Sequence, residues 1–165
     1  MSAIDPAQFR SVLGRFPTGV AVITATGPQD RPAGMACNSF TSVSLDPPLV
    51  LFGAAVGSAT LPVIRESGRF CVNVLGVRHE RLCRQFAARG VDRFADVRWT
   101  PSPWGPQLSE AIARIDCAVT AEHPAGDHLV VIGRVVRLAA TGDEAPLVFH
   151  RGRYGSFAAT ADLLG

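Results

Sequence analysis

Short apolar, β-branched runs separated by Pro- and Gly-rich turns are the feature that most constrains how this chain can fold. These runs are Val20–Thr26, Leu49–Ala54, Arg69–Val74, Ile112–Glu122, His128–Leu138 and Leu147–Arg151. Turn residues at 124–127 join two such runs, and those at 27–31 join Val20–Thr26 to an extended pattern that resumes at Ala33, which is typical of β-hairpins. Six or seven strands with only two or three helices between them predict an antiparallel barrel rather than alternating βαβ units. We therefore expect a β-rich α+β fold.

Three segments show helical features. Asp5 and Pro6 are a typical N-cap and first helical residue. The apolar residues that follow at helical spacing are Phe9, Val12, Leu13 and Phe16. A short helix is expected over Leu61–Ser67, and an amphipathic one over Val77–Ala88. Residues 89–107 have little periodicity, so we expect a long, partly ordered surface excursion there.

Length and composition indicate one globular domain over residues 1–165. The net charge is only +2 and charges of both signs are scattered, which argues against a nucleic-acid or membrane-surface partner. We find no secretory signal pattern after Met1 and no apolar stretch that could span a bilayer. Four widely spaced cysteines, Cys37, Cys71, Cys83 and Cys117, favour buried, reduced thiols and a cytoplasmic location.

The stretch Met35–Pro48 concentrates polar side chains in apolar surroundings. Five hydroxyl or amide residues lie within eight positions, namely Asn38, Ser39, Thr41, Ser42 and Ser44. We expect them on a strand that begins near Ala33, pairs with the preceding strand and breaks at Asp46–Pro48. Burial without partners would cost roughly 1–3 kcal/mol per group. The partners could be backbone, water or a ligand.

No dinucleotide-binding G-x-G-x-x-G and no P-loop motif occurs in the sequence. A phosphate would therefore have to be held by hydroxyls and backbone N–H groups. Two segments suit that role, Asn38–Ser42 and Gly57–Thr60, and the second leads into a helix start that favours anions. Ordinary helix capping is an equally good explanation of Ser58 and Thr60.

Two histidines are candidate site residues, His79 and His128. His79 and Cys83 lie four apart on a predicted helix, but no second ligand pair accompanies them, so we expect no metal site. His128 follows a turn at the rim of the predicted barrel, where it could face a ligand, although a plain turn residue is the simpler alternative. No G-x-S-x-G serine elbow is present. Arg151, Arg153 and Tyr154 could be a solvated strand end or could bind an aromatic, phosphorylated ligand.

Several segments together resemble the flavin reductase family, the FMN-binding split-barrel proteins that act as reductase components of two-component flavin monooxygenases. The similar segments are Phe16–Thr24, Gly34–Pro48, Phe70–Leu75, Phe86–Ala87, Asp92–Phe94, Gly126–His128 and Pro146–Tyr154. They run through nearly the whole chain, and their order and spacing make the resemblance specific.

The resemblance implies an antiparallel Greek-key split barrel with a few peripheral helices. It also implies a homodimer with flavin near the subunit interface, and hydride transfer from NADH or NADPH to FMN, with FAD possible. The partner is then a monooxygenase that receives the reduced flavin. A split-barrel oxidase that keeps its flavin, and a non-catalytic flavin-binding protein for electron transfer or sensing, are the alternatives.

The resemblance also implies roles for individual residues. Along the isoalloxazine we expect Met35, Ala36, Cys37 and Asn38; at the ribityl or phosphate groups, Ser39, Thr41 and Ser42; and at the second phosphate contact, Ser58, Ala59 and Thr60. Phe86 and Arg89 match a segment that approaches the flavin. His128 and Tyr154 match positions on the nicotinamide side, where we expect His128 to orient the ring rather than to move protons.

Two positions depart from the family pattern. Residue 36 is Ala where the family often has Thr, and no basic residue precedes Ser58. Arg65, Arg89 or Arg93 could supply the missing positive charge. Without a dinucleotide fingerprint and its acidic residue, the sequence gives no preference between NADH and NADPH.

Overall fold

The computed structural model describes residues 4–160. Its α-helices are α1 (Pro6–Leu13), α2 (Thr60–Ser67) and α3 (Glu80–Ala87), and its 3-10 turns are η1 (Pro28–Asp30) and η2 (Val77–His79). Its strands are β1 (Thr18–Gly19), β2 (Ala21–Thr26), β3 (Pro32–Cys37), β4 (Thr41–Leu45), β5 (Pro48–Ala55), β6 (Arg69–Val74), β7 (Trp99–Thr100), β8 (Gln107–Leu108), β9 (Ala113–Ala125), β10 (His128–Ala140), β11 (Leu147–His150) and β12 (Arg153–Ser156). No helix in this range is long and apolar enough to cross a membrane.

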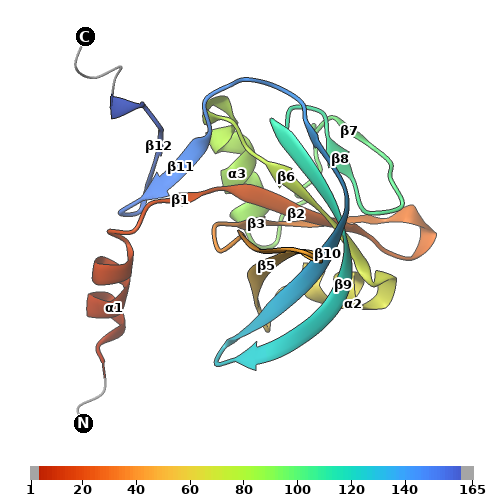
Figure 1. Ribbon diagram of the computed structural model, residues 1–165, viewed down its shortest axis with the longest axis horizontal. Helices are drawn as coiled ribbons and strands as arrows, with labels where there is room; N and C mark the ends of the chain where they lie inside the picture. The colour runs from red at the N-terminus through yellow and green to blue at the C-terminus, as the bar shows by residue number, and fades with distance from the viewer. Residues whose placement is uncertain (1–3, 161–165) are drawn as a thin grey trace.

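Seven of these strands form one antiparallel sheet in the order β3-β2-β6-β9-β10-β5-β4. The sheet curls until β3 and β5 contact each other, although these two strands share no ladder (Figure 1). We call the opening between β3 and β5 the seam. The sheet is thus a barrel that is closed on all sides but one, and the predicted β-rich, antiparallel class is confirmed.

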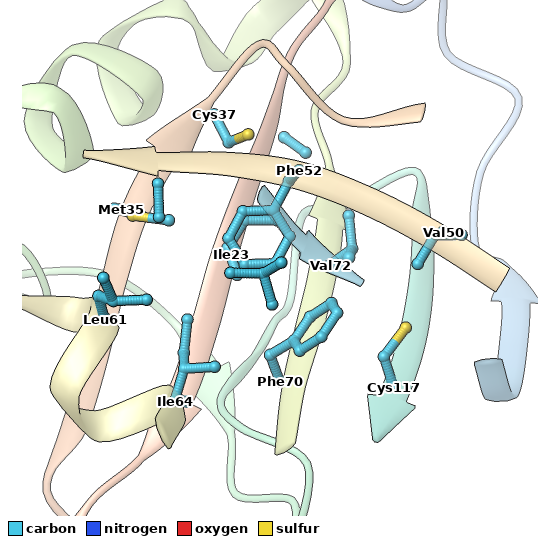
Figure 2. Packing of buried hydrophobic residues seen from close by; sticks show 14 of the residues in the cluster. Ile23, Met35, Cys37, Val50, Phe52, Leu61, Ile64, Phe70, Val72 and Cys117 are labelled. Carbon is cyan, nitrogen blue, oxygen red and sulfur yellow. The ribbon is translucent and has the colours of Figure 1, made fainter. Parts of the chain in front are cut away.

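Successive side chains of each strand point to opposite faces of the sheet, and the two faces form two apolar layers. Side chains that point into the barrel, such as Ile23, Phe52 and Phe70, form the main core, with Leu61 and Ile64 of α2 closing one end (Figure 2). The opposite faces of β2 and β3 pack against α3 in a second cluster, which includes Val22, Cys83 and Phe86. Both faces of β2 are therefore buried, which explains its continuous apolar run.

The ends of the described chain lie outside the barrel. β1 pairs with β11, and β11 pairs with β12, in a separate three-stranded sheet. The side chain of Asp5 caps α1 by accepting from the N–H groups of Ala7 and Gln8, as expected. α1 stands away from the barrel (Figure 1), and none of its residues is buried. Its apolar face is therefore not covered by this chain.

The polar stretch does not follow the predicted single strand. β3 pairs with β2 as expected, but the ladder ends at Cys37, and β4 pairs with β5 rather than with β2. Ser39 explains the change of partner, because its hydroxyl bonds to the backbone of Gly53 on β5. The chain thus crosses the seam between residues 37 and 41, and the expectation of one continuous strand was wrong.

The 89–107 segment is more ordered than expected. The buried side chain of Asn73 donates to Pro106 O (3.3 Å) and accepts from the N–H of Leu108 (2.8 Å), and Thr24 Oγ1 donates to Pro106 O at 2.7 Å. Gly105, at φ +122°, lies so close to β2 that a Cβ would be 2.5 Å from Thr24 O. The segment is therefore fastened to the outer face of β2 and β6 by polar groups within the protein.

Candidate functional site at the barrel seam

Ser39 bridges the seam. Its hydroxyl donates to Gly53 O (3.2 Å), accepts from Gly53 N (2.9 Å) and lies 3.3 Å from Cys37 Sγ. One side chain in the connection after β3 thus joins it to β5, with which β3 shares no ladder. Burial raises the pKa of the Cys37 thiol, which keeps it neutral beside this hydroxyl.

The chain before α2 meets β3 at the same place. Ser58 Oγ donates to Met35 Sδ at 3.3 Å and accepts from the N–H of Thr60 at 3.2 Å. The side chain of Thr60 is only 2% exposed, so it is part of the core at the helix start. The two segments singled out as possible phosphate sites, 38–42 and 57–60, are therefore both next to β3, and Ser58 acts as a local cap as well.

His128 lies on the other flank of Gly53. It begins β10 and pairs with Ala55 of β5. A Cβ on Gly53 would lie 3.2 Å from Ser39 Oγ and 4.0 Å from His128 Cδ2, so bare backbone separates the two side chains. The imidazole is 49% exposed, and its Nδ1 lies 2.7 Å from Asp127 Oδ1. This hydrogen bond from His128 lowers the pKa of Asp127.

Phe86 has a supporting position rather than an exposed one. Its ring is fully buried and packs edge-on against Phe94, with centroids 5.0 Å apart. A Cβ on Gly34 would lie 2.6 Å from Phe86 Cε1, so α3 rests directly on the backbone of β3. Only a glycine at position 34 permits this contact.

The three arginines that could bind a phosphate differ in whether their guanidinium groups already have partners within the protein. Arg65 pairs with Glu122 at 2.7 Å. Arg93 uses all three of its nitrogens on the backbone carbonyls of Ala88 and Gly34. Arg89 is exposed and makes no hydrogen bond or ion pair to any residue in the described range 4–160. Of the three, Arg89 is the one whose guanidinium is available to an anion.

Tyr154 lies apart from His128, on the side of α3. Its hydroxyl accepts a hydrogen bond from Cys83 (3.3 Å), its ring packs against Phe149, and the guanidinium of Arg84 lies 4.9 Å from the ring centroid. Burial and the Cys83 bond raise the pKa of Tyr154 to about 12. No interaction in the described chain joins Tyr154 to His128, so one chain does not bring these two predicted residues together. His79 and Cys83, the other pair considered, each have protein partners: His79 Nδ1 accepts from the N–H of Gly76, its Nε2 lies 3.6 Å from Glu110 Oε2, and Cys83 donates to Tyr154.

A groove of about 1460 Å³ opens between α1 and residues 38–41. It adds residues that the sequence did not single out, namely Arg10, Arg15, Thr18, Phe40 and Phe149. Thr18 Oγ1 is buried and, within residues 4–160, has no hydrogen-bond partner. An unsatisfied hydroxyl beside exposed hydroxyls, arginines and aromatic rings fits a polar, aromatic, anionic ligand such as a flavin nucleotide. Only the folded chain brings these groups together, so no spacing in the sequence could have identified them.

Known proteins are similar to this chain over most of its length. A model of the flavin reductase like domain matches residues 13–158. HsaB, the reductase subunit of a flavin-dependent monooxygenase from Rhodococcus jostii (strain RHA1), is 48% identical over 92% of this chain and 78% of its own length. The FMN reductase (NADH) SmoA of Agrobacterium fabrum (strain C58 / ATCC 33970) is 43% identical over 91% of this chain and 85% of its own length.

A solved structure supports the same conclusion. The NADH:FAD oxidoreductase SgcE6 of Streptomyces globisporus C-1027, in complex with NAD and FAD fragments, has a TM-score of 0.89 and 36% identity, covering 98% of this chain and all of that one. The likeness to such structures confirms the predicted split barrel. By fold and by sequence, the chain belongs to the flavin reductase family.

Proposed function

We propose that this protein is an NAD(P)H:flavin oxidoreductase that reduces FMN or FAD and supplies the reduced flavin to a separate flavin-dependent monooxygenase. HsaB is named a reductase subunit of such a monooxygenase, SmoA an FMN reductase (NADH), and SgcE6 an NADH:FAD oxidoreductase. The observation that carries the proposal is the seam, where Ser39 and His128 flank the half-buried backbone of Gly53 and Ser58 donates to Met35 of β3.

The residues around the seam fit a flavin. Its ring would lie along Met35, Ala36, Cys37 and Asn38, and its ribityl and phosphate groups would reach Ser39, Thr41, Ser42 and residues 58–60. Arg89 is the arginine that would balance the phosphate charge, since Arg65 and Arg93 are engaged elsewhere. Phe86 contributes by supporting β3 from beneath rather than by contact.

A bound flavin supplies an acceptor for hydride from the nicotinamide, and that chemistry belongs to the cofactors. The protein has to hold and orient the two rings, which can supply several kcal/mol of the barrier. Asp127 fixes the imidazole of His128 through Nδ1, and Nε2 makes no hydrogen bond within the described residues. His128 would therefore orient the nicotinamide through Nε2. Tyr154 would act on the nicotinamide side only where a second subunit brings it to the seam.

A homodimer fits the exposed apolar surface. Four apolar residues on and after α1 are more than half exposed, namely Phe9, Val12, Leu13 and Phe16. Val43 and Leu45 on β4 are exposed as well, at 50% and 95%. Soluble monomers rarely leave such patches uncovered, and a second copy of this chain would cover both. Sedimentation velocity would report a single species of twice the chain mass.

The remaining features agree with a single domain over residues 1–165 acting in the cytoplasm. The family model spans most of the chain, and all four cysteines, each within the described range, are free and buried. Free thiols are the usual state in a reducing compartment.

A steady-state assay tests the proposed reaction. Loss of nicotinamide absorbance would be followed with NADH and NADPH, each combined with FMN, FAD and riboflavin. Turnover with at least one pair, without an added organic substrate, is the expected result. No turnover with any pair would contradict the proposal and would favour a flavin-binding protein without reductase activity.

His128→Ala tests the orienting role. We expect the KM for the reduced nicotinamide to rise about tenfold while the KM for flavin changes little, because only one ring loses its contact. His123→Ala is the matched control, since His123 is exposed on β9. A larger rise in the KM for flavin than for nicotinamide would show that His128 serves the flavin instead.

A further inference from the structure

Arg93 links the end of α3 to the strand at the seam. Its Nε and Nη2 both donate to the carbonyl of Ala88, at 3.0 and 2.8 Å, and its Nη1 donates to the carbonyl of Gly34 at 2.8 Å. Ala88 is the C-cap of α3, so its carbonyl has no partner within the helix. One half-buried guanidinium therefore satisfies a helix end and a strand carbonyl together.

The strand side of this link is an edge. β3 is the terminal strand of the seven-stranded sheet, so the backbone groups on its outer side have no ladder partner. Arg93 binds that edge at Gly34, directly before Met35 and Ala36, where the flavin ring would lie. The edge strand could otherwise shift, because Gly34 has no side chain with which to anchor it.

The position of Arg93 is itself fixed from both sides. Gln85 donates to the carbonyls of Arg93 (3.0 Å) and Ala95 (2.8 Å), and the next residue, Phe94, packs against Phe86. Phe86 in turn lies against Gly34. The guanidinium, two aromatic rings and α3 therefore form one rigid support beneath β3.

We propose that Arg93 is a positioning residue for flavin binding, which holds β3 at Gly34 so that residues 35–38 keep the geometry that the isoalloxazine ring requires. This inference rests on the proposed function. It also separates Arg93 from the phosphate, because each of the three guanidinium nitrogens already donates to a backbone carbonyl, which fixes the group against α3 and β3. Arg89 and Arg93 lie four residues apart but serve different parts of the flavin.

Arg93→Lys and Arg93→Ala test the proposal, with flavin affinity measured by the quenching of flavin fluorescence. Lysine has one ammonium group and cannot span both carbonyls. A misplacement of β3 by a fraction of an ångström should weaken FMN binding about tenfold in either variant. Riboflavin binding should weaken by the same factor, since the ring and not the phosphate is affected. Ethylguanidinium added to Arg93→Ala should restore part of the lost affinity.

Arg98→Ala is the matched control. Arg98 lies in the same 89–107 segment but is exposed and pairs with Glu110 at the surface. This variant should bind flavin as the wild type does, and all variants should keep the KM for reduced nicotinamide within about twofold. Circular dichroism and the unfolding temperature would be recorded for each protein.

Three results would overturn the proposal. The first is wild-type flavin affinity in both Arg93 variants. The second is weaker binding of FMN with unchanged binding of riboflavin, which would make Arg93 a phosphate ligand. The third is a parallel change of kcat and both KM values with a lowered unfolding temperature, which would indicate general loss of structure. A wild-type protein that neither binds nor reduces flavin would instead refute the proposed function.

Discussion

Two polar segments of this chain look alike in sequence and differ in the fold. Residues 38–42 and the 89–107 segment both lack periodicity and carry many polar side chains. In the second, Pro106 and Gln107 are bound by buried groups of the protein, and so is the next residue, Leu108; these groups include Asn73 and Asp116. In the first, within residues 4–160, only the side chain of Ser39 bonds to another strand, and the hydroxyl of Thr41 bonds no further than Ser42.

The difference shows how a polar cluster should be interpreted. Polar residues whose partners lie within the protein stabilise a loop, whereas polar residues left exposed beside a groove are available to a ligand. Residue types alone do not separate the two cases, because serine, asparagine and threonine serve in both. Substitutions in the two segments should therefore have opposite profiles, with loss of stability in one and loss of flavin affinity in the other.

Asn73→Ala should have the largest effect. The buried amide binds Thr24 Oγ1 (3.1 Å), Pro106 O and Leu108 N, and its loss leaves buried partners unsatisfied. We expect the free energy of unfolding to fall by about 2–4 kcal/mol. Urea unfolding would measure it, with Thr41→Ala as a control that should change it by less than about 0.5 kcal/mol. A loss below about 1 kcal/mol in Asn73→Ala would mean that the 89–107 segment is held by packing instead.

Ser39→Ala should have the reverse profile. The stability should fall by only about 1 kcal/mol, since the Ser39 hydroxyl is near solvent. Flavin affinity should fall about five- to tenfold, because β3 and β5 lose their bridge across the seam at Gly53. Ser102→Ala is the matched control from the other segment, where the hydroxyl accepts from the N–H of Trp104. Equal flavin affinity in the two variants would remove the distinction between the segments.

Alkaline pH should lower the stability of the protein, and the thiol beneath the 89–107 segment should contribute more to this loss than the thiol at the seam. Burial and the neighbouring charge of Asp116 raise the pKa of Cys71, whereas burial raises that of Cys37 and hydrogen bonds with Ser39 act against this rise. A raised pKa means that the folded thiol keeps its proton when the unfolded one loses it. Its contribution is thus complete below about pH 9 and is lost as the pH rises further, by up to about 1.4 kcal/mol per pH unit.

Thermal unfolding from pH 8 to 10.5 would test this linkage. The unfolding temperature of the wild type should decrease over that range. Cys71→Ala should flatten the decrease more than Cys37→Ala does. A larger flattening in Cys37→Ala than in Cys71→Ala would contradict this. It would show that the thiol at the seam, and not the one beneath residues 89–107, is the better protected from deprotonation.

Much of the fold could be predicted from local patterns. Strands β2, β5 and β6, the helix α2 and the cap at Asp5 agree with the expected ranges to within a residue or two. Periodicity and turn residues act over a few positions, so they are readable in the sequence. β12 and the separate strand β4 were missed, since their pairing depends on partners that lie across a turn or across the seam.

The sequence by itself determined the strand-rich class, the polar stretch after Met35 and, through the order of its segments, the flavin reductase family. The tertiary structure decided which polar groups are available. Ser39 and His128 flank Gly53 only because the curled sheet brings β3, β5 and β10 together. Arg65 and Arg93 are engaged while Arg89 is not, because the partners of a charged side chain are set by neighbours distant in the sequence. Local patterns report burial, but the pairing of polar groups depends on the closed barrel.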